Sequence, residues 1–175
     1  NVTIPPPPPP PVVEWTGMMS FTFDDSWLSQ HTNALPILQA AGIKATFYIT
    51  TQPIIEVWDD FMTPANILDL NAKGHEIAGH TVTHADLTTL STANITKEVG
   101  DSKNYLDQLI GHAITQFAYP YGSYNTTVIN ILKTAGYKGA RGVDDSDQNV
   151  PATDEYAQFG QCYETSMTLA QIKQQ

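Results

Sequence analysis

The chain contains little cysteine and few basic residues, and it has no long apolar run. Its single Cys162 cannot form an internal disulfide, so cysteine content does not indicate a redox compartment. Lys and Arg total 8 against 18 acidic residues, and the formal net charge of −10 argues against nucleic-acid binding, which needs clustered basic side chains. No segment approaches the roughly 20 apolar residues that cross a bilayer. No signal peptide is evident either, so we expect a secreted form to be mature or trimmed.

Proline, by contrast, is concentrated near the N-terminus. Residues 5–11 are all proline, which extends as polyproline II and indicates a stiff spacer, with a recognition motif as the alternative. We therefore expect a linker over residues 1–14, an upstream domain or anchor, and one domain over residues 15–175. Only 15% of residues are charged, and this polar, weakly charged composition favours an extracellular or cell-surface protein. We expect it to be a monomer.

Strand-like and helix-like patterns alternate after the spacer. Short apolar or β-branched segments predict strands at residues 18–24, 45–49, 76–79, 115–118 and 138–143. Helical spacing with flanking Gly or Pro predicts helices at residues 31–41, 64–74, 96–109 and 125–135. This alternation predicts an α/β fold with a parallel sheet, open or closed into a barrel. Beyond Val143 the pattern weakens to one possible strand at residues 158–163 and a helix starting near Thr168.

Polar side chains follow three of these strands. Asp24 and Asp25 end the first, His80 and His84 follow the third, and Tyr119-Pro120-Tyr121-Gly122 follows the fourth. Functional groups gather at the carboxyl ends of parallel strands, so all three motifs should reach one rim. If residues 80–84 form one helical turn, both imidazoles can reach one cation beside a carboxylate. Taken singly, an Asp pair is usually a solvated turn and Pro-Tyr-Gly a simple turn.

Together, these motifs resemble the NodB-homology polysaccharide deacetylases, which are carbohydrate esterases, over about residues 18–143. The resemblance implies a distorted (β/α) barrel and removal of acetyl groups from N- or O-acetylated polysaccharide or oligosaccharide. It implies that Asp24 is the general base and that one divalent metal is held by Asp25, His80 and His84. The metal would be zinc in most cases, with cobalt, nickel or manganese as alternatives. The Tyr121 backbone N–H would help bind the oxyanion.

Two positions depart from the family pattern. Ala118 stands where an Arg usually orients the catalytic Asp, as a Tyr-Pro-Tyr-Gly branch of the family tolerates. Arg141 is our candidate replacement, and the alternative is a surface Arg paired with Asp144 or Asp145. The family also continues into a strand ending in a general-acid His, which nothing after Thr168 matches. We therefore expect a barrel incomplete at its C-terminus, either with an open gap beside the first strand or within a longer protein.

The remaining candidates concern the substrate. Pro120, Tyr121 and Gly122 would line its site, and Trp27, Tyr121 and Tyr124 offer flat faces for sugar rings, although any of them could be core. His31 lies near the rim, where a helix-start His is more often solvated. The leading hypothesis is a metal-dependent polysaccharide deacetylase. The alternatives are a related domain that binds metal and sugar with little turnover, and a binding module on a proline stalk without metal.

Overall fold

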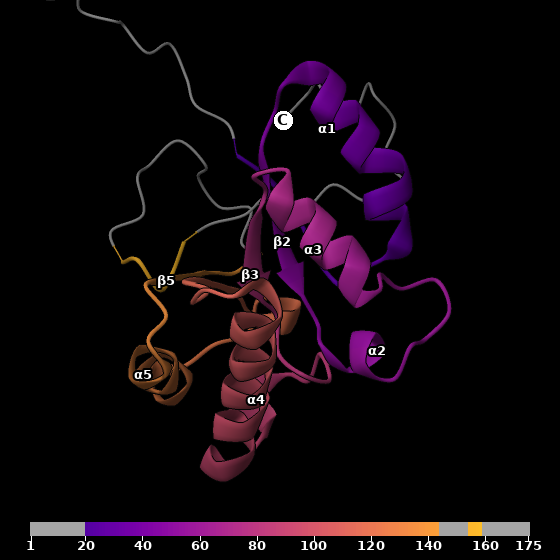
Figure 1. Ribbon diagram of the computed structural model, residues 1–175. Helices are drawn as coiled ribbons and strands as arrows, with labels where there is room; N and C mark the ends of the chain where they lie inside the picture. Colours follow the sequence, from indigo (N-terminus) through magenta and orange to yellow (C-terminus); the bar gives the residue numbers. More distant parts are fainter. Residues whose placement is uncertain (1–19, 144–153, 159–175) are drawn as a thin grey trace, which may run out of the picture.

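Five parallel strands form the centre of the fold. The computed structural model describes residues 20–143 and 154–158. The strands lie in chain order across one sheet: β1 (Phe21–Phe23), β2 (Ala45–Ile49), β3 (Glu76–Gly79), β4 (Gln116–Ala118) and β5 (Gly139–Arg141) (Figure 1). Each lies within a segment predicted from the sequence, and the parallel sheet is confirmed.

Helices connect successive strands. They are η1 (Gln30–Ala34, a π-helix) with α1 (Leu35–Ala41), α2 (Gln52–Ile55) with α3 (Pro64–Ala72), η2 (Leu87–Thr89) with α4 (Thr92–Ile110), and η3 (Pro120–Gly122) with α5 (Thr126–Ala135). The four predicted helices are confirmed, whereas the short α2 was not predicted. Helix α4 begins earlier than expected because the Ser91 hydroxyl accepts a hydrogen bond from the Asn94 N–H at 3.3 Å, which caps it.

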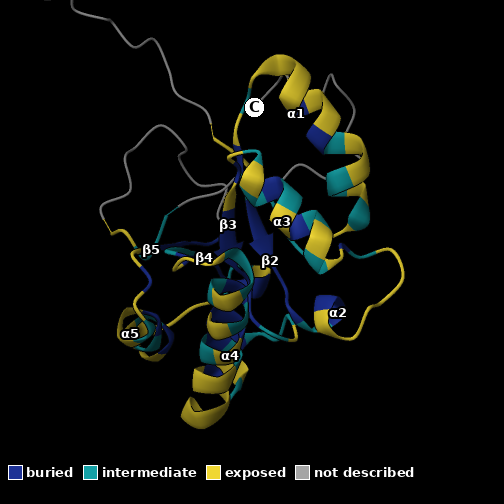
Figure 2. Cartoon of the chain, in the orientation of Figure 1, coloured by how far each residue is buried: buried dark blue, intermediate teal, exposed yellow. Residues whose placement is uncertain are grey.

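The two faces of the sheet carry different side chains. On the outer face, Phe47, Ile77 and Phe117 are buried in the main core, which the helices complete. The inner face carries a second, smaller cluster of Tyr48, Ala78 and Ala118. Figure 2 shows β2, β3 and β4 mostly buried and the outer sides of the helices exposed, whereas β1 has no buried residue. Side chains alternate between the two faces along a strand. Residues two positions after Tyr48, Ala78 and Ala118 therefore also point to the inner face, next to this second cluster.

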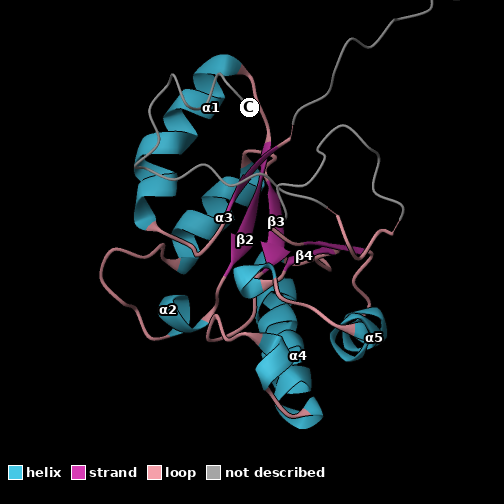
Figure 3. Ribbon diagram, turned by 180° about the vertical axis from the view of Figure 1, so that it is seen from behind, coloured by secondary structure: helices cyan, strands magenta, loops and turns pink. Residues whose placement is uncertain are grey.

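The sheet is strongly curled. Strands β3 and β4 share one register pair, Gly79 with Phe117, and the sheet changes direction there (Figure 3). In a flat sheet with strands about 4.8 Å apart, β5 would lie ~19 Å from β1. Yet Arg141 of β5 contacts Asp24, which directly follows β1. The described residues therefore form part of a distorted (β/α) barrel, as the sequence predicted.

Some expectations lie outside the described residues. These are the linker over residues 1–14 and the helix near Thr168. Of the possible strand at residues 158–163, only Gln158 is described, and it forms a single parallel bridge with Arg141. Across residues 20–143 and 154–158, no helix combines the length and the apolar character that a membrane span needs.

Candidate metal and active site

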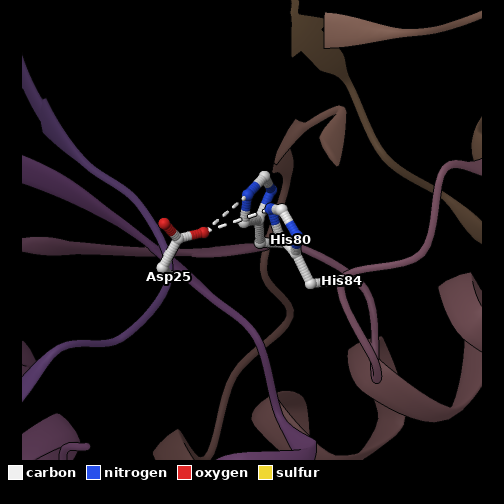
Figure 4. A group of neighbouring side chains, drawn as sticks. All are labelled: Asp25, His80 and His84. Carbon is white, nitrogen blue, oxygen red and sulfur yellow. Dashed lines mark ion pairs between the residues drawn. The ribbon is translucent and has the colours of Figure 1, made fainter. Parts of the chain in front are cut away.

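One carboxylate and two imidazoles converge where β1 and β3 end. Asp25 follows β1, and His80 and His84 lie in the loop after β3 (Figure 4). Asp25 Oδ1 lies 3.4 Å from His80 Nε2 and 3.2 Å from His84 Nε2. The potential ligand atoms all lie within 4.8 Å of one another. In the described ranges, no other group of three or more His, Cys, Asp or Glu side chains is close enough to hold a metal ion.

The His80 ring is fixed by its second nitrogen. His80 is buried, and its Nδ1 lies 2.7 Å from the backbone oxygen of Ala118 on β4. A carbonyl only accepts hydrogen bonds, so Nδ1 carries the proton and donates it. The neutral ring then has its lone pair on Nε2, the nitrogen that faces Asp25. Such an outer hydrogen bond is what orients a metal-binding histidine.

The loop after β1 turns sharply to present Asp25. Asp25 and Ser26 have φ angles of 72° and 69°, in the left-handed region that non-glycine residues rarely adopt. Ser26 is fully buried, and its hydroxyl donates to the Thr50 carbonyl at 3.2 Å and accepts from the Thr50 N–H at 2.9 Å. These two hydrogen bonds tie the strained turn to the end of β2. Contact with the His80 ring is the main cause that lowers the pKa of Asp25, and burial opposes it.

The loop between the two histidines is not a helical turn, which corrects that expectation. Thr81 and His84 have φ angles of 68° and 60°, so the chain bends back on itself between them. The buried Thr81 hydroxyl accepts a hydrogen bond from the His84 N–H at 2.9 Å. Burial is the main cause that lowers the pKa of His84, which keeps this ring neutral and able to bind a cation.

A carboxylate from helix α4 holds the same loop. Glu98 Oε2 accepts the Val82 and Thr83 N–H groups, both at 2.9 Å, and Glu98 Oε1 accepts the Thr83 hydroxyl at 2.8 Å. Hydrogen bonds to a charged acceptor are about twice as strong as neutral ones. Sequence reasoning missed Glu98, since Val82 and Thr83 lie 16 and 15 residues before it in the chain and no local pattern marks it.

This arrangement fits a divalent cation. Ligands bound at about 2.0–2.1 Å in tetrahedral geometry lie ~3.4 Å from one another. The distances from Asp25 Oδ1 to the two imidazole nitrogens, 3.4 and 3.2 Å, are close to that value. Asp25 Oδ1 is also buried and has no hydrogen-bond partner among the described residues, a costly state for a carboxylate oxygen unless a cation lies beside it.

Asp24 lies beside this group and pairs with Arg141. Arg141 is only 8% exposed, its Nη2 donates to Asp24 Oδ1, and its guanidinium lies 4.6 Å from the Tyr48 ring centre. Burial raises the pKa of Tyr48 to about 12, so its hydroxyl stays protonated and the ring is neutral beneath the Arg141 guanidinium. Arg141 is the register partner of Ala118, so the two occupy neighbouring positions on the inner face. A buried Arg141 argues against the alternative of a surface Arg.

The Tyr119–Gly122 segment borders His84. Tyr121 has a φ of 57° and an exposed ring that packs edge-on against the His84 ring, with centres 4.7 Å apart. Gly122 has a φ of 71°, and a Cβ there would lie 2.5 Å from Val143 Cγ2, so only glycine fits. Pro120 is buried, while Tyr124 is exposed on one face and stacks on Tyr119 with the other. These positions place Tyr121 at the metal-binding group and Tyr124 farther along the same loop.

A cavity opens on the other side of Asp25 and His84. It is also lined by Trp27, which the sequence singled out, and by Trp58 and Phe61, which it did not. The last two come from the α2–α3 loop, where no motif indicated a site. Trp27 stacks on Phe61 with ring centres 4.4 Å apart, and Trp58 meets Phe61 edge-on at 5.8 Å.

The remaining histidines lie outside the metal-binding group. His31 bonds to Asp69 Oδ2 at 2.9 Å and to the Asn66 amide at 3.3 Å, so both ring nitrogens are engaged with helix α3. His75 and His112 precede β3 and β4, so they lie at the opposite end of the sheet from the metal-binding group.

Comparisons with known proteins agree with the fold and the motifs. A sequence model of the polysaccharide deacetylase family matches residues 15–140. A chitin deacetylase from Pestalotiopsis sp is 32% identical over 118 residues, which cover 67% of this chain and 39% of that protein. This chain therefore spans about two fifths of that relative's length.

Two solved structures have the same fold. The Streptococcus pyogenes deacetylase PplD, in complex with acetate, has a TM-score of 0.80 and 27% identity over 92% of this chain and 71% of that chain. A family 4 carbohydrate esterase from Streptomyces lividans has a TM-score of 0.64 and 23% identity over 74% of this chain and 64% of that chain. The Streptomyces lividans likeness shows the fold alone.

Proposed function

This chain belongs to the polysaccharide deacetylase family, and from that premise we propose that it is a metal-dependent hydrolase that removes acetyl groups from polysaccharide. The observation that carries the proposal is the Asp25–His80–His84 group with the Asp24–Arg141 pair beside it. The complex of PplD with acetate, the product of deacetylation, supports the same reaction class.

We propose that Asp25, His80 and His84 hold one divalent cation, with zinc as the first choice because two imidazoles and one carboxylate suit it. When bound, such a cation supplies a Lewis acid for the acetyl carbonyl and makes water more acidic. His80 and His84 serve this role as neutral rings, and Asp25 supplies the one negative charge. The remaining coordination positions are left for water and substrate.

Asp24 is proposed as the general base. Asp24 directly precedes the metal-binding Asp25 in the chain, and its carboxylate accepts the proton of the attacking water. Arg141 holds that carboxylate in place through its Nη2, and stacking on Tyr48 in turn fixes the guanidinium. Arg141 is therefore a positioning residue. The Tyr121 backbone N–H is proposed to donate to the oxyanion that forms at the acetyl carbon.

The proposed substrate is an acetylated polysaccharide or oligosaccharide. The exposed faces of Tyr121 and Tyr124, near the turn of Pro120 and Gly122, offer stacking surfaces for sugar rings, and Trp27 offers another in the cavity beside Asp25. Because such polymers are found in cell walls and extracellular material, we also propose that the protein acts outside the cell. Detection of the protein in the culture medium or on the cell surface, and not in the cytosol, would support this location.

Acetate release tests the proposal. The zinc-loaded protein is incubated with acetylated chito-oligosaccharide, peptidoglycan and acetylxylan, and acetate is measured beside a metal-free sample. We expect release from at least one polymer that depends on the added metal. Metal binding with no acetate from any polymer would instead favour a domain that binds without turnover.

A further inference from the structure

Thr50, which directly follows β2, contacts both segments that carry the buried side of the metal-binding group. Its backbone N–H and carbonyl bond to the Ser26 hydroxyl, and its own hydroxyl donates to the His80 carbonyl at 3.2 Å. Resting on the proposed function, we propose that Thr50 is a positioning residue. It fixes the spacing of Asp25 and His80 and thereby determines how tightly the cation is bound.

The order of the strands explains why such a connection is needed. β2 lies between β1 and β3, so the two strands that present Asp25 and His80 do not pair with each other. With neighbouring strands about 4.8 Å apart, β1 and β3 are separated by ~10 Å. Asp25 Oδ1 and His80 Nε2 nevertheless lie 3.4 Å apart. A connection across the end of β2 can set this distance, and Thr50 bonds to both sides.

On the β1 side, a single hydroxyl takes the place of a strand partner. The regular pairing of β1 with β2 ends at Phe23 and Phe47. Beyond this pair, the Ser26 hydroxyl accepts the Thr50 N–H at 2.9 Å and donates to the Thr50 carbonyl at 3.2 Å. These are the two groups that a neighbouring parallel strand would otherwise bond. The left-handed turn that presents Asp25 is therefore anchored to Thr50.

On the β3 side, the end of β2 holds both backbone groups of His80. The His80 N–H donates to the Ile49 carbonyl at 3.0 Å, and the His80 carbonyl accepts the Thr50 hydroxyl at 3.2 Å. The ring itself is held through Nδ1 by the Ala118 carbonyl. Because the backbone and the ring are both fixed, the position of Nε2 relative to Asp25 depends on the bond from Thr50.

Burial makes these hydrogen bonds effective. Ser26 and Thr50 are 0% and 4% exposed, so water cannot easily replace a bond that is lost. The next residue, Thr51, is equally buried, but its hydroxyl has no hydrogen-bond partner among the described residues. Thr50 and Thr51 therefore differ in their hydrogen bonds and not in their burial, which makes Thr51 a matched control.

The test removes the Thr50 hydroxyl and measures metal binding. Thr50→Val keeps the branched shape of the side chain and the backbone bonds to Ser26, but it loses the bond to His80. Its zinc dissociation constant, from competition with a chelator, should rise about tenfold, the lower end of the range for groups that orient metal ligands. The visible spectrum of bound cobalt(II), which changes with the arrangement of the ligands, should shift. Thr50→Ser should restore both, and Thr51→Val should match the wild type.

Ser26→Ala breaks the other half of the connection and provides a second variant if Thr50→Val does not fold. It should also weaken zinc binding about tenfold. Because the two substitutions interrupt the same connection, the double variant should bind zinc about as tightly as either single variant. Thermal melting with and without zinc separates positioning from stability. A purely structural role would lower the Tm of the metal-free protein and leave the zinc-induced rise in Tm unchanged.

Acetate release distinguishes this proposal from the proposed function. An unchanged zinc dissociation constant in Thr50→Val and Ser26→Ala, additive losses in the double variant, or an equal loss in Thr51→Val would overturn the role of Thr50. Acetate release by the wild type would still support the deacetylase in each of these cases. Zinc binding that depends on Thr50, without acetate release, would keep this role and refute the deacetylase. A wild type that binds no zinc would overturn both.

Discussion

Among single residues, His80 and His84 differ in how their rings are held, because His80 alone of the two donates a hydrogen bond to the Ala118 carbonyl. His80 is buried and has its tautomer fixed by the backbone. His84 is more exposed and is held by ring contacts with His80 and Tyr121. Removing His84 therefore takes away a ligand without emptying a buried site, which makes it the better position for substitution.

We expect His84→Ala to lose the metal together with acetate release. With two of the three ligands left, the bound metal should be lost on dialysis, as elemental analysis would show. Metal at 100 times its dissociation constant stabilises a folded protein by about 2.7 kcal/mol, or roughly 5–11 °C in Tm for a chain of this size. That shift should vanish in the variant. His31→Ala, which lies outside the metal-binding group, should retain the metal and acetate release. Full metal occupancy in His84→Ala would refute the ligand assignment.

Asp24→Asn should retain the metal and lose most of the activity. The amide keeps the shape of the side chain but cannot accept a proton from water. General-base catalysis typically contributes ~10²–10⁴-fold, so kcat should fall within that range. Metal content should stay at its wild-type value. A loss of less than about tenfold would count against Asp24 as the base.

Arg141→Lys should impair catalysis without loss of metal. Lysine keeps the charge, but it cannot contact the Tyr48 face and the Gly142 carbonyl while it donates to Asp24. We expect kcat to fall about tenfold and KM to change little, since Asp24 loses its orientation and not its partner's charge. Steady-state kinetics separate the two constants. An unchanged kcat would show that Arg141 has no positioning role.

At the scale of elements, helix α4 holds the metal-binding loop through one side chain. Glu98 accepts three hydrogen bonds from Val82 and Thr83, the residues between the histidines. The far side of the loop is tied to α2 by the Gln52 N–H, which donates to the Val82 carbonyl at 2.9 Å. The left-handed conformations of Thr81 and His84 persist because both sides are held.

Glu98→Gln should weaken metal binding about tenfold, at the lower end of the 10–100-fold range for outer groups around metal ligands. The amide oxygen can still accept the Val82 and Thr83 N–H groups, but it is neutral, and hydrogen bonds to a neutral acceptor are about half as strong as those to a carboxylate. The metal dissociation constant can be measured by competition with a chelator. Glu76→Gln is the control, because this exposed carboxylate accepts a hydrogen bond from the Thr46 hydroxyl at the other end of β3. Equal affinity in both variants would refute the role of Glu98.

At the scale of the whole molecule, stability should depend on pH through His75. This residue is buried, and its Nδ1 accepts the Ala45 N–H at 3.2 Å, which requires the neutral ring. Burial, and then the charges of Lys44 and Lys73, lower its pKa below 6.5. Between that lowered pKa and 6.5 the unfolded chain binds more protons than the folded chain. The free energy of unfolding should therefore decrease as the pH falls through this range.

Urea unfolding of the metal-free protein at about pH 5 and pH 7 measures this dependence. His75→Gln keeps an acceptor for Ala45 but has no ionisable ring, so the difference between the two pH values should shrink. His84 also has a lowered pKa, but it contributes equally to both proteins. His112→Gln, which removes an exposed histidine, serves as the control. An identical pH dependence for His75→Gln and wild type would contradict the prediction.

Much of the fold and the centre of the site could be predicted because they depend on local patterns. The five strands and four main helices lie where apolar spacing, prolines and glycines indicated. Asp25, His80 and His84 come together because the carboxyl ends of parallel strands share one edge, so their positions in the sequence already implied a common rim. The Asp24, Arg141 and Tyr121 roles stay predictions.

Local sequence patterns thus specify which residues reach the rim, whereas packing between distant segments selects which of them touch. Arg141 meets Asp24 only because the sheet curls, a distance that strand propensity does not specify. Glu98 reaches the histidine loop, and Trp27 stacks on Phe61, through contacts between separate segments of the chain. The left-handed turns at Asp25, Thr81 and His84 are unfavourable locally and are held by Ser26, the Thr81 hydroxyl and Glu98. Only tertiary contacts can compensate such local strain, so no local pattern predicted them.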